Sequence, residues 1–233
     1  MRLRTLEPSY RSHGAPPGDA DDEGERAAPF ELDTHVPGGS DPVDTLAQAA
    51  RNLRTMIAAA RLKDGRPPKS IVLLSAEAEP ETALTAGNLA IASARSGWRT
   101  LLVDTSNGQA VQTRLFRIEP GAAVAPLEEV ADLGAFVQQT AVPDLFLLSV
   151  GGVEQSNVGG TVDPHRFLEP LVADFDLLLI DASHTSTDCP LSEAAEAAIV
   201  VLRQDHSTVS CVGEMIGRLR MQGTPLLGTF LVA

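Results

Sequence analysis

The sequence predicts an α/β domain with a largely parallel sheet, preceded by a tail without regular structure. Two observations support this prediction. Short apolar runs of strand character alternate with segments of helical periodicity along most of the chain. The N-terminal residues up to Pro42 contain few aliphatic side chains. With 233 residues and a hydrophobic content of 43%, the chain is long enough for one sizeable domain beside such a tail.

The N-terminal tail has the composition of a disordered segment. Residues 1–42 are rich in glycine, proline and acidic residues, and Gly18–Glu25 consists mainly of carboxylates. Such a segment cannot bury enough apolar surface to offset the entropy that ordering would cost. We therefore expect residues 1–42 to be disordered and residues 43–233 to form the folded domain.

The domain should begin with a helix and continue as alternating strands and helices. Apolar residues recur at helical spacing from Asp44 to Ala60, which predicts about five turns capped by Asp41 or Asp44. The expected strands are Ile71–Leu74, Thr100–Val103, Leu145–Val150, Leu177–Ile180, Ala198–Leu202 and Leu226–Val232. The expected helices are Thr85–Ser96, Leu127–Gln139, Pro164–Ala173, Leu191–Ala195 and Ser207–Gln222. Strands separated by helices form parallel sheets with right-handed crossovers.

The segment Ser75–Leu84 lies between a predicted strand and a predicted helix, where phosphate-binding loops occur. Such a loop needs glycines that let backbone N–H groups reach the phosphates, a lysine for their charge, and a Ser or Thr hydroxyl for Mg²⁺. This segment instead contains three glutamates and a proline, without glycine or lysine. The sequence therefore predicts the scaffold of a nucleotide site without its chemistry.

Two carboxylates follow apolar strands. Asp104 ends one strand and Asp181 ends another. Nucleotide-hydrolysing proteins place Mg²⁺-binding carboxylates in this way, although an Asp after a strand also caps the turn that follows, and the sequence leaves both interpretations open. Because parallel strands end at one edge of a sheet, Ser75, Asp104 and Asp181 should lie close together.

Several stretches of the domain share a family likeness. They are Arg51–Thr55, Lys69–Glu77, Asn88–Ala92, Gly97–Asp104, Phe175–Asp181 and Pro225–Gly228. In these stretches, which span roughly Asp44 to Val232, the chain resembles the bacterial tyrosine kinase (BY-kinase) family. These are the capsular and exopolysaccharide kinases related to the Min/Par ATPases. The resemblance implies a Rossmann-like parallel sheet of P-loop NTPase type, flanked by helices.

The chain departs from this family where nucleotide would bind. The family has Pro-Gly-Glu-Gly-Lys-Ser-Thr at the position of Ala78–Leu84. Here Glu79 and Glu81 replace the glycines, Thr82 replaces the lysine and Ala83 replaces the Mg²⁺-binding hydroxyl. Each lost charge-assisted hydrogen bond costs about 1.5–3 kcal/mol. Each glutamate adds repulsion of about 1–4 kcal/mol toward a phosphate.

Other family positions have changed as well. Asp104–Ser106 keeps one carboxylate of an Asp-x-Asp motif, and Ala182–His184 replaces Thr-Pro-Pro. The asparagine that lies near the adenine falls at about Val232. The tyrosine cluster that such kinases phosphorylate is missing, since the single tyrosine is Tyr10.

The resemblance and these departures together imply a catalytically inactive, docking or regulatory subunit in capsule or exopolysaccharide polymerisation and export. Its partner would be a membrane polysaccharide co-polymerase. Asp104 and Asp181 would be remnants of a site without cofactor. One alternative is an active ATPase or tyrosine kinase that binds ATP and Mg²⁺ through a rearranged loop, using Thr82 and Thr85. Another is a Min/Par-like positioning protein that has lost its nucleotide switch.

The first predicted helix carries a candidate interface. Gln48, Arg51 and Arg54 follow one edge of the helix at a spacing of three residues. They match the family's Glu-x-x-Arg-x-x-Arg motif, with glutamine in place of glutamate. In the family this motif makes subunit contacts in a ring, which implies a homo- or hetero-oligomer contact here. A solvated helix face explains the same pattern.

Composition limits the classes of partner. A formal net charge of −13 and a pI near 4.7 argue against nucleic acid and against anionic lipid surfaces. No segment approaches the length of about 20 apolar residues that crosses a bilayer. We therefore expect a cytoplasmic protein that reaches the inner membrane only through a partner. The two cysteines, Cys189 and Cys211, are expected to be buried thiols.

Overall fold

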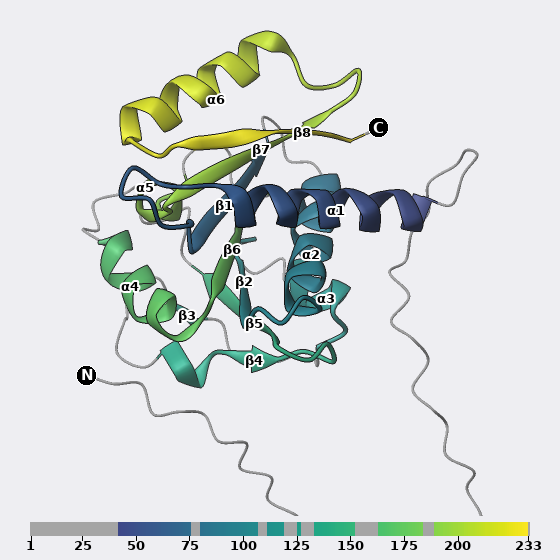
Figure 1. Cartoon of the computed structure of the whole chain (residues 1–233), viewed down its shortest axis with the longest axis vertical. Coiled ribbons are helices and arrows are strands. Elements are labelled where there is room, and N and C mark those ends of the chain that lie inside the picture. The colour runs from purple at the N-terminus through teal and green to yellow at the C-terminus, as the bar shows by residue number, and fades with distance from the viewer. Residues whose placement is uncertain are drawn as a thin grey trace, which may run out of the picture.

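The computed structural model is a three-layer α/β sandwich (Figure 1). It describes residues 42–75, 80–106, 111–118, 125–126, 133–151, 163–183 and 189–232. Residues 1–41 of the expected disordered tail, including the cap residue Asp41, lie outside this part of the chain, whereas Pro42 is the first residue of a helix.

The sheet of the described chain has eight strands in the order β3-β5-β2-β6-β1-β7-β8, with β4 paired to β5. Its strands are β1 (Ser70–Ser75), β2 (Thr100–Asp104), β3 (Ala125–Pro126), β4 (Gln138–Gln139), β5 (Leu145–Gly151), β6 (Leu177–Asp181), β7 (Ala197–Arg203) and β8 (Leu226–Val232). All pairs are parallel except β4 with β5. Every residue of β1, β2 and β6 is buried, which explains why these strands read as continuous apolar runs.

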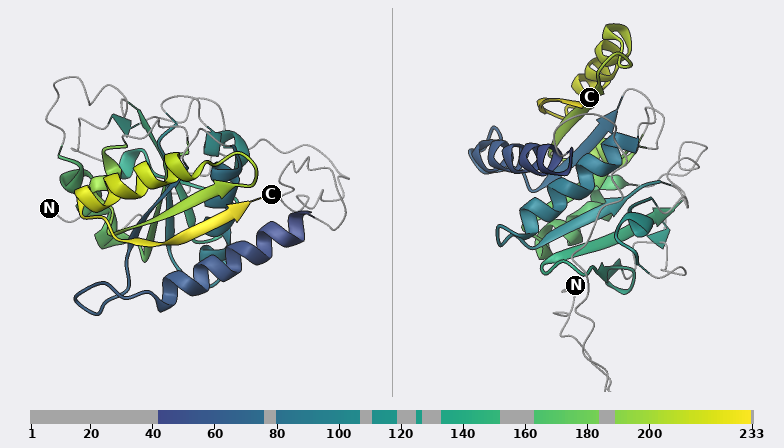
Figure 2. Two further views of the ribbon diagram at one scale, coloured as in Figure 1. Left: turned by 90° about the horizontal axis from the view of Figure 1, so that it is seen from above. Right: turned by 90° about the vertical axis from the view of Figure 1, so that its right-hand side faces the viewer.

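Helices cover both faces of the sheet. On one face lie α1 (Pro42–Ala59), α2 (Pro80–Ala94) and α3 (Val111–Leu115), whose apolar side chains pack with Leu73, Leu102 and Leu179. On the other face lie α4 (Pro164–Asp174), α5 (Leu191–Ala194) and α6 (Val209–Gln222), packed against Val103 and Ile180. Figure 2 shows α1 and α6 on opposite sides of β7 and β8.

The six predicted strands are confirmed, and so are the helices that became α1, α2, α4, α5 and α6. Thr208 caps α6, because its Oγ1 accepts a hydrogen bond from the Cys211 N–H at 3.3 Å. Gly97 follows α2 with a φ of 87°, in the left-handed region that favours glycine, and its N–H donates to the Ala94 carbonyl.

The predicted start of one helix is wrong, and so is one whole predicted helix. Helix α2 begins at Pro80 rather than Thr85, because proline at the first helical position and Glu81 in the first turn both suit a helix N-terminus. The helix predicted over Leu127–Gln139 is not observed in the described residues 133–139. A 3₁₀ turn at Leu133–Ala135 is followed there by β4, whose two residues pair with β5.

A polar cluster fixes the segment between α1 and β1 against the start of β7. One oxygen of Glu196 accepts a hydrogen bond from the Lys69 N–H at 2.6 Å, and the other pairs with Arg66 Nη2 at 2.6 Å. Burial acts to raise the pKa of Glu196. The bonds from Arg66 and from the Lys69 N–H outweigh it and hold this pKa below its usual range. The cluster therefore positions α1 relative to the β7–β8 side of the sheet.

The two cysteines do not form a disulfide: Cys189 is buried and Cys211 is half-buried. Within the described chain, the helices are all too short or too polar to cross a membrane.

Leu102 tests the core. Its side chain is fully buried in the middle of β2. We expect Leu102→Ala to lower the free energy of unfolding by about 2–5 kcal/mol, because the neighbouring strands cannot close around the cavity. Urea unfolding followed by the fluorescence of Trp98 measures this change. A loss well below this range would place Leu102 outside the packed core.

Candidate functional site

Asp104 and Asp181 meet at the carboxyl edge of the sheet, as predicted. They end the neighbouring parallel strands β2 and β6 and stand directly opposite each other in the register. Leu73, near the end of β1, is the partner of Asp181 on its other side. Each aspartate is only 2% exposed. Two carboxylates are thus buried side by side at the place where this kind of sheet binds ligands.

All four oxygens of the two carboxylates accept hydrogen bonds from the chain itself. The oxygens of Asp104 accept from the N–H groups of Ser106 and Gln112, both at 2.9 Å. One oxygen of Asp181 accepts from the Ser183 N–H at 3.1 Å, and the other accepts from Gln112 Nε2 at 2.6 Å. Asp104 therefore caps the turn after β2 and the start of α3, the interpretation that the sequence left open beside metal binding.

Gln112 joins the two carboxylates to helix α2. It is fully buried, and its Nε2 donates both to Asp181 and to the carbonyl oxygen of Ala83, the latter at 2.8 Å. Gly87 makes room for it, since a Cβ on this glycine would lie 3.2 Å from Gln112 Oε1. The sequence analysis missed Gln112. Gly87 inside the predicted helix Thr85–Ser96 was the available signal, because a glycine within a helix often has a packing reason.

Burial dominates the electrostatics of Asp181. It raises the pKa of this carboxyl above its usual value by disfavouring the charged form, and the neighbouring Asp104 acts in the same direction. The hydrogen bonds from Gln112 and Ser183 oppose the shift without cancelling it. Asp181 therefore takes up a proton more readily than an exposed aspartate.

The residues that replace the lysine and the Mg²⁺-binding hydroxyl lie inside the first turn of α2. Thr82 and Ala83 are 0% and 1% exposed. Thr82 Oγ1 has no hydrogen-bond partner among the described residues. Glu79, predicted to replace one of the glycines, lies outside the described chain. Of the described positions in the predicted loop, Thr82 and Ala83 offer no exposed group for a phosphate or a metal.

Glu81 lies near an arginine that the sequence analysis did not predict as its partner. Its Oε1 lies 3.7 Å from Nε of Arg203, the last residue of β7. The position of Arg203 follows from the sheet order, because β7 lies beside β1 and Val201 is the register partner of Ser75. Glu81 also lies near the N-terminus of α2, where a negative charge is favourable.

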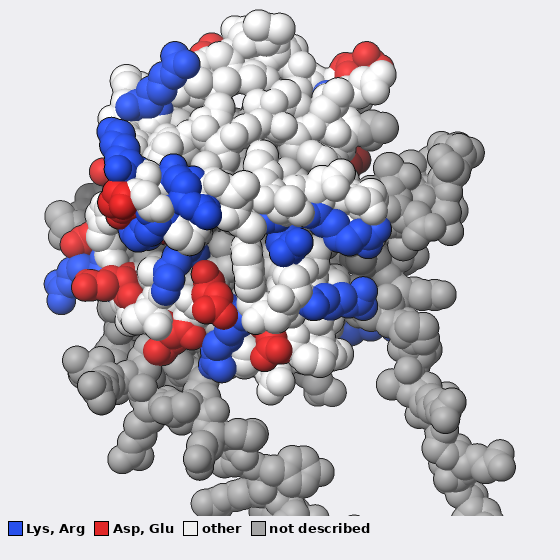
Figure 3. Space-filling model, in the orientation of Figure 1, with Lys and Arg blue, Asp and Glu red and all other residues white. Residues whose placement is uncertain are grey.

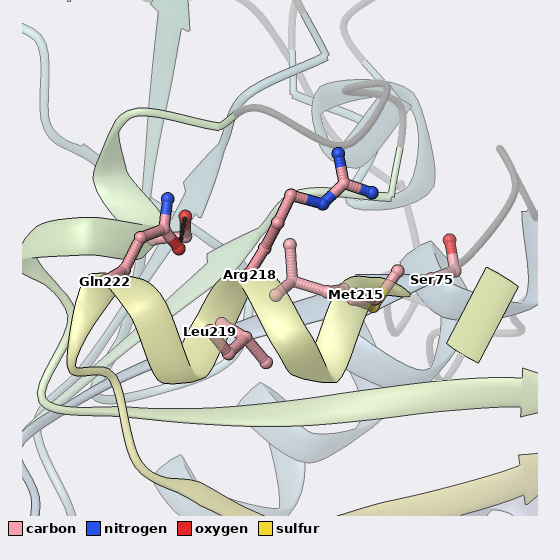
Figure 4. Close-up of a pocket in the computed structure, with 7 residues that line it drawn as sticks. Ser75, Met215, Arg218, Leu219 and Gln222 are labelled. Carbon is pink, nitrogen blue, oxygen red and sulfur yellow. Dashed lines mark hydrogen bonds between the residues drawn. The ribbon is translucent and has the colours of Figure 1, made fainter. Parts of the chain in front are cut away.

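A small pocket lies on the other side of the end of β1 (Figure 4). Ser75, at the end of β1, lines it together with Met215, Arg218, Leu219 and Gln222 of α6. Leu74 and Ser192 complete the lining. Its volume suits about one water molecule and is far too small for a nucleotide.

The predicted interface helix forms as expected, with one difference. Gln48 Oε1 accepts hydrogen bonds from Arg51 Nε at 3.2 Å and Nη2 at 2.7 Å, so these exposed residues contact each other. Arg54 instead places its guanidinium 5.9 Å from the centre of the Trp98 ring. Basic side chains gather over α1 in the surface view (Figure 3).

The described residues do not fit a bound magnesium nucleotide. Magnesium prefers several oxygen ligands, including waters and phosphate oxygens, in an open octahedral arrangement. Here the two carboxylates are engaged by the chain's own N–H groups, and alanine stands at the position of the hydroxyl ligand. The described part of the chain contains no cluster of three or more His, Cys, Asp or Glu side chains able to hold a metal.

The fold of the chain is similar to that of solved Min and plasmid-partition proteins. The septum site-determining protein MinD of Pyrococcus horikoshii, solved with Mg-ADP, is 18% identical, with a TM-score of 0.54 over 70% of this chain and 69% of that chain. No family model and no curated protein matches the sequence.

Within that class, tyrosine kinase domains align over more of the chain. The BceF tyrosine kinase domain is 26% identical, with a TM-score of 0.63 over 79% of this chain and 76% of that chain. The kinase domain of Escherichia coli tyrosine kinase Etk is 18% identical, with a TM-score of 0.64 over 79% and 74%. The structural neighbours are therefore bacterial tyrosine kinase domains and Min/Par-type ATPases, which confirms the resemblance predicted from the sequence. Fold similarity leaves the activity to be argued from the site.

Asp181 should make stability depend on pH. Because its pKa is raised in the folded state, it contributes stability that is fully present below its unfolded pKa of about 4. That stability is lost as the pH rises through the folded-state pKa. Asparagine carries no charge at any pH, so Asp181→Asn should gain stability relative to the wild type as the pH rises above about 4. Urea unfolding at several pH values measures the difference, and a difference independent of pH would contradict the prediction.

Gln112 should contribute to stability through its side chain. Gln112→Ala removes the donor to a buried carboxylate and to the Ala83 carbonyl. The expected loss is about 1.5–3 kcal/mol in the free energy of unfolding, the range for hydrogen bonds to charged groups. Gln139→Ala, at an exposed position of β4, serves as control and should change stability by less than about 0.5 kcal/mol. Equal effects of the two substitutions would refute a bridging role for Gln112.

Proposed function

We propose that this chain is a catalytically inactive, kinase-like subunit of a capsule or exopolysaccharide polymerisation and export system. In this role it docks on a membrane polysaccharide co-polymerase and acts through its shape, without nucleotide turnover. The family resemblance supplies the process and the partner, while the site supplies the argument for inactivity.

One observation carries the inactivity. The four oxygens of Asp104 and Asp181 already accept hydrogen bonds from Ser106, Gln112 and Ser183. In a phosphoryl-transfer site, the corresponding oxygens must be available to a metal ion and its waters. Binding Mg²⁺ here would require withdrawal of the Gln112 amide, which would also break its bond to Ala83. The site is closed by the chain's own groups.

The start of α2 supports the same conclusion. A helix N-terminus attracts phosphate through its free N–H groups and its dipole. Here Glu81 brings a carboxylate of the chain to this position, beside Arg203. A phosphate would meet this negative charge with a repulsion of about 1–4 kcal/mol. It would gain no compensation from the buried Thr82 and Ala83.

The proposed docking contact is the exposed edge of α1. Gln48, Arg51 and Arg54 correspond to the family's subunit-contact motif, and basic side chains mark this helix on an acidic molecule (Figure 3). Gln48 lacks the charge of the family's glutamate, so it holds Arg51 by a hydrogen bond between a cation and a neutral amide. The loss of this charge should weaken a self-assembled ring. A mixed contact with another subunit is compatible with the change.

The domain plan and location complete the proposal. Residues 1–42 would be a disordered tail and residues 43–233 the docking domain. The protein would work at the cytoplasmic face of the inner membrane, held there by its partner. Neither nucleic acid nor lipid is proposed as a ligand, since the net charge is −13.

Nucleotide binding tests the inactivity. In isothermal titration with Mg²⁺ and ATP, we expect no binding tighter than about 1 mM, because the lost contacts remove several kcal/mol of affinity. The kinase domain of Etk serves as the positive control. Micromolar binding by this chain would overturn the inactive-subunit proposal and favour an active ATPase or kinase.

Partner recovery tests the docking helix. The tagged full chain would be purified from detergent-solubilised membranes of cells that produce the polysaccharide co-polymerase of the same export system. Arg51→Ala combined with Arg54→Ala should reduce recovery of the co-polymerase at least about tenfold, as expected when central arginines are removed from an interface. The control is Arg166→Ala, which removes an exposed arginine from α4 on the other face of the sheet. Unchanged recovery with the double variant would remove α1 from the interface.

A further inference from the structure

Charge is divided unevenly along this chain. Residues 42–69, which form α1 and the segment up to β1, contain six basic and two acidic residues. Residues 70–233 contain eight basic and twenty acidic residues. The folded domain is therefore acidic apart from one basic segment, and basic side chains gather over α1 on its surface (Figure 3).

Two arginines of α1 have no carboxylate partner within the part of the chain that the structure describes. Arg51 is exposed and donates to the neutral amide oxygen of Gln48 at 2.7 and 3.2 Å. Arg54 lies 5.9 Å from the centre of the Trp98 ring. The ion pairs of the described residues involve other arginines. Because guanidinium groups favour carboxylates, this edge of α1 suits an acidic ligand.

The chain carries an acidic tract shortly before this helix. The tract Asp19–Glu25 contains five carboxylates and no basic residue. Since α1 begins at Pro42, residues 26–41 connect the tract to the helix. The excess of carboxylates in residues 70–233 repels the tract, and the basic segment attracts it.

The connecting segment is long enough for the tract to reach both arginines. Arg51 lies nine residues after Pro42 and Arg54 twelve, or about 14 and 18 Å along the helix axis. A flexible chain of about 16 residues, the length of residues 26–41, spans about 20–24 Å on average. This span matches the distance from the start of α1 to the two guanidinium groups.

We propose that the acidic tract Asp19–Glu25 binds to the Arg51 and Arg54 edge of α1 in its own chain. Carboxylates of the tract pair with the two guanidinium groups. A single surface ion pair contributes little to binding. The tether compensates, because a short flexible connection gives the tract an effective concentration in the millimolar range. The contact is electrostatic and exposed, so salt releases it.

The bound tract covers the edge of α1 that is proposed to dock on the co-polymerase. This consequence rests on the proposed function. The tract and the co-polymerase need the same arginines, so the binding of one excludes the other. The apparent affinity for the partner then falls in proportion to the fraction of molecules whose edge is free.

Energy transfer within the full chain tests the contact without a partner. Trp98 is the single tryptophan and lies beside Arg54, so it serves as the donor. A dansyl acceptor is attached to Ala20→Cys in a Cys211→Ser background, since Cys189 is buried. Transfer in about 10 mM salt should be at least about twofold more efficient than in about 1 M salt, where the Debye length is about 3 Å. Each labelled protein is compared with its unlabelled counterpart.

Charge variants locate the contact. Arg51→Gln combined with Arg54→Gln should lower the transfer efficiency in low salt to the value in high salt. Neutralising the tract by Asp21→Asn, Asp22→Asn and Glu23→Gln together should do the same. The matched control is Arg166→Gln, at an exposed position of α4, which should leave the efficiency unchanged. Circular dichroism verifies that every variant is folded.

Three outcomes would overturn the proposal. Transfer that does not depend on salt means that the tract does not bind the domain through charge. Salt-dependent transfer that survives the change of both arginines places the tract elsewhere on the molecule. Transfer that increases with protein concentration between about 1 and 100 µM means that the tract binds a second copy of the chain.

Recovery of the co-polymerase distinguishes this proposal from the proposed function. Neutralising the tract should raise recovery about twofold, the factor expected when the tract covers half of the edges. Unchanged recovery would overturn the covering of the docking edge by the tract. If the energy transfer behaves as expected but no variant recovers the co-polymerase, the contact of the tract stands and the docking function is refuted.

Discussion

The arrangement of this molecule depends on how two adjacent buried carboxylates are satisfied. Asp104 and Asp181 end neighbouring strands, which are about 4.8 Å apart in any sheet. A pair of buried negative charges at that distance is unfavourable unless donors or protons neutralise it. This chain supplies N–H donors from Ser106, Gln112 and Ser183, and it raises the pKa of Asp181. A kinase of this fold would use a metal ion for the same purpose.

The hydrogen bonds of Gln112 link three elements at this edge of the sheet. Gln112 on α3 contacts Asp181 at the end of β6 and the Ala83 carbonyl in the first turn of α2. At the other side of that turn, Glu81 lies near Arg203 at the end of β7. The edge of the sheet is thus held together by internal contacts between positions far apart in the sequence.

The sequence was sufficient for the six longer strands and insufficient for the short strands β3 and β4 and for the contacts at the carboxyl edge of the sheet. Strand β8 was predicted with its observed bounds, since only Gly228 and Thr229 interrupt its apolar run and Pro225 precedes it. The start of α2 was predicted too late in the sequence, because Pro80–Leu84 matches the position of a phosphate-binding loop. Pro80 and Glu81 nevertheless suit the start of a helix. Gln112 and Arg203 could not be found from local pattern. Gln112 contacts Asp181, which is 69 positions away along the chain. Arg203 lies near Glu81 because β7 and β1 are neighbours in the sheet, which only the sheet order reveals.

The contrast between the two edges of the sheet bears on function. At the carboxyl edge, the described carboxylates are engaged and the residues in place of lysine and hydroxyl are buried. At the lateral edge, β7 is the one described strand that pairs with β8. A protein that binds and hydrolyses nucleotide needs the first edge open, whereas a protein that works by contact needs the second. A closed carboxyl edge is what the proposed inactive subunit requires, because a phosphoryl-transfer site must leave these carboxylate oxygens available to a metal ion and its waters.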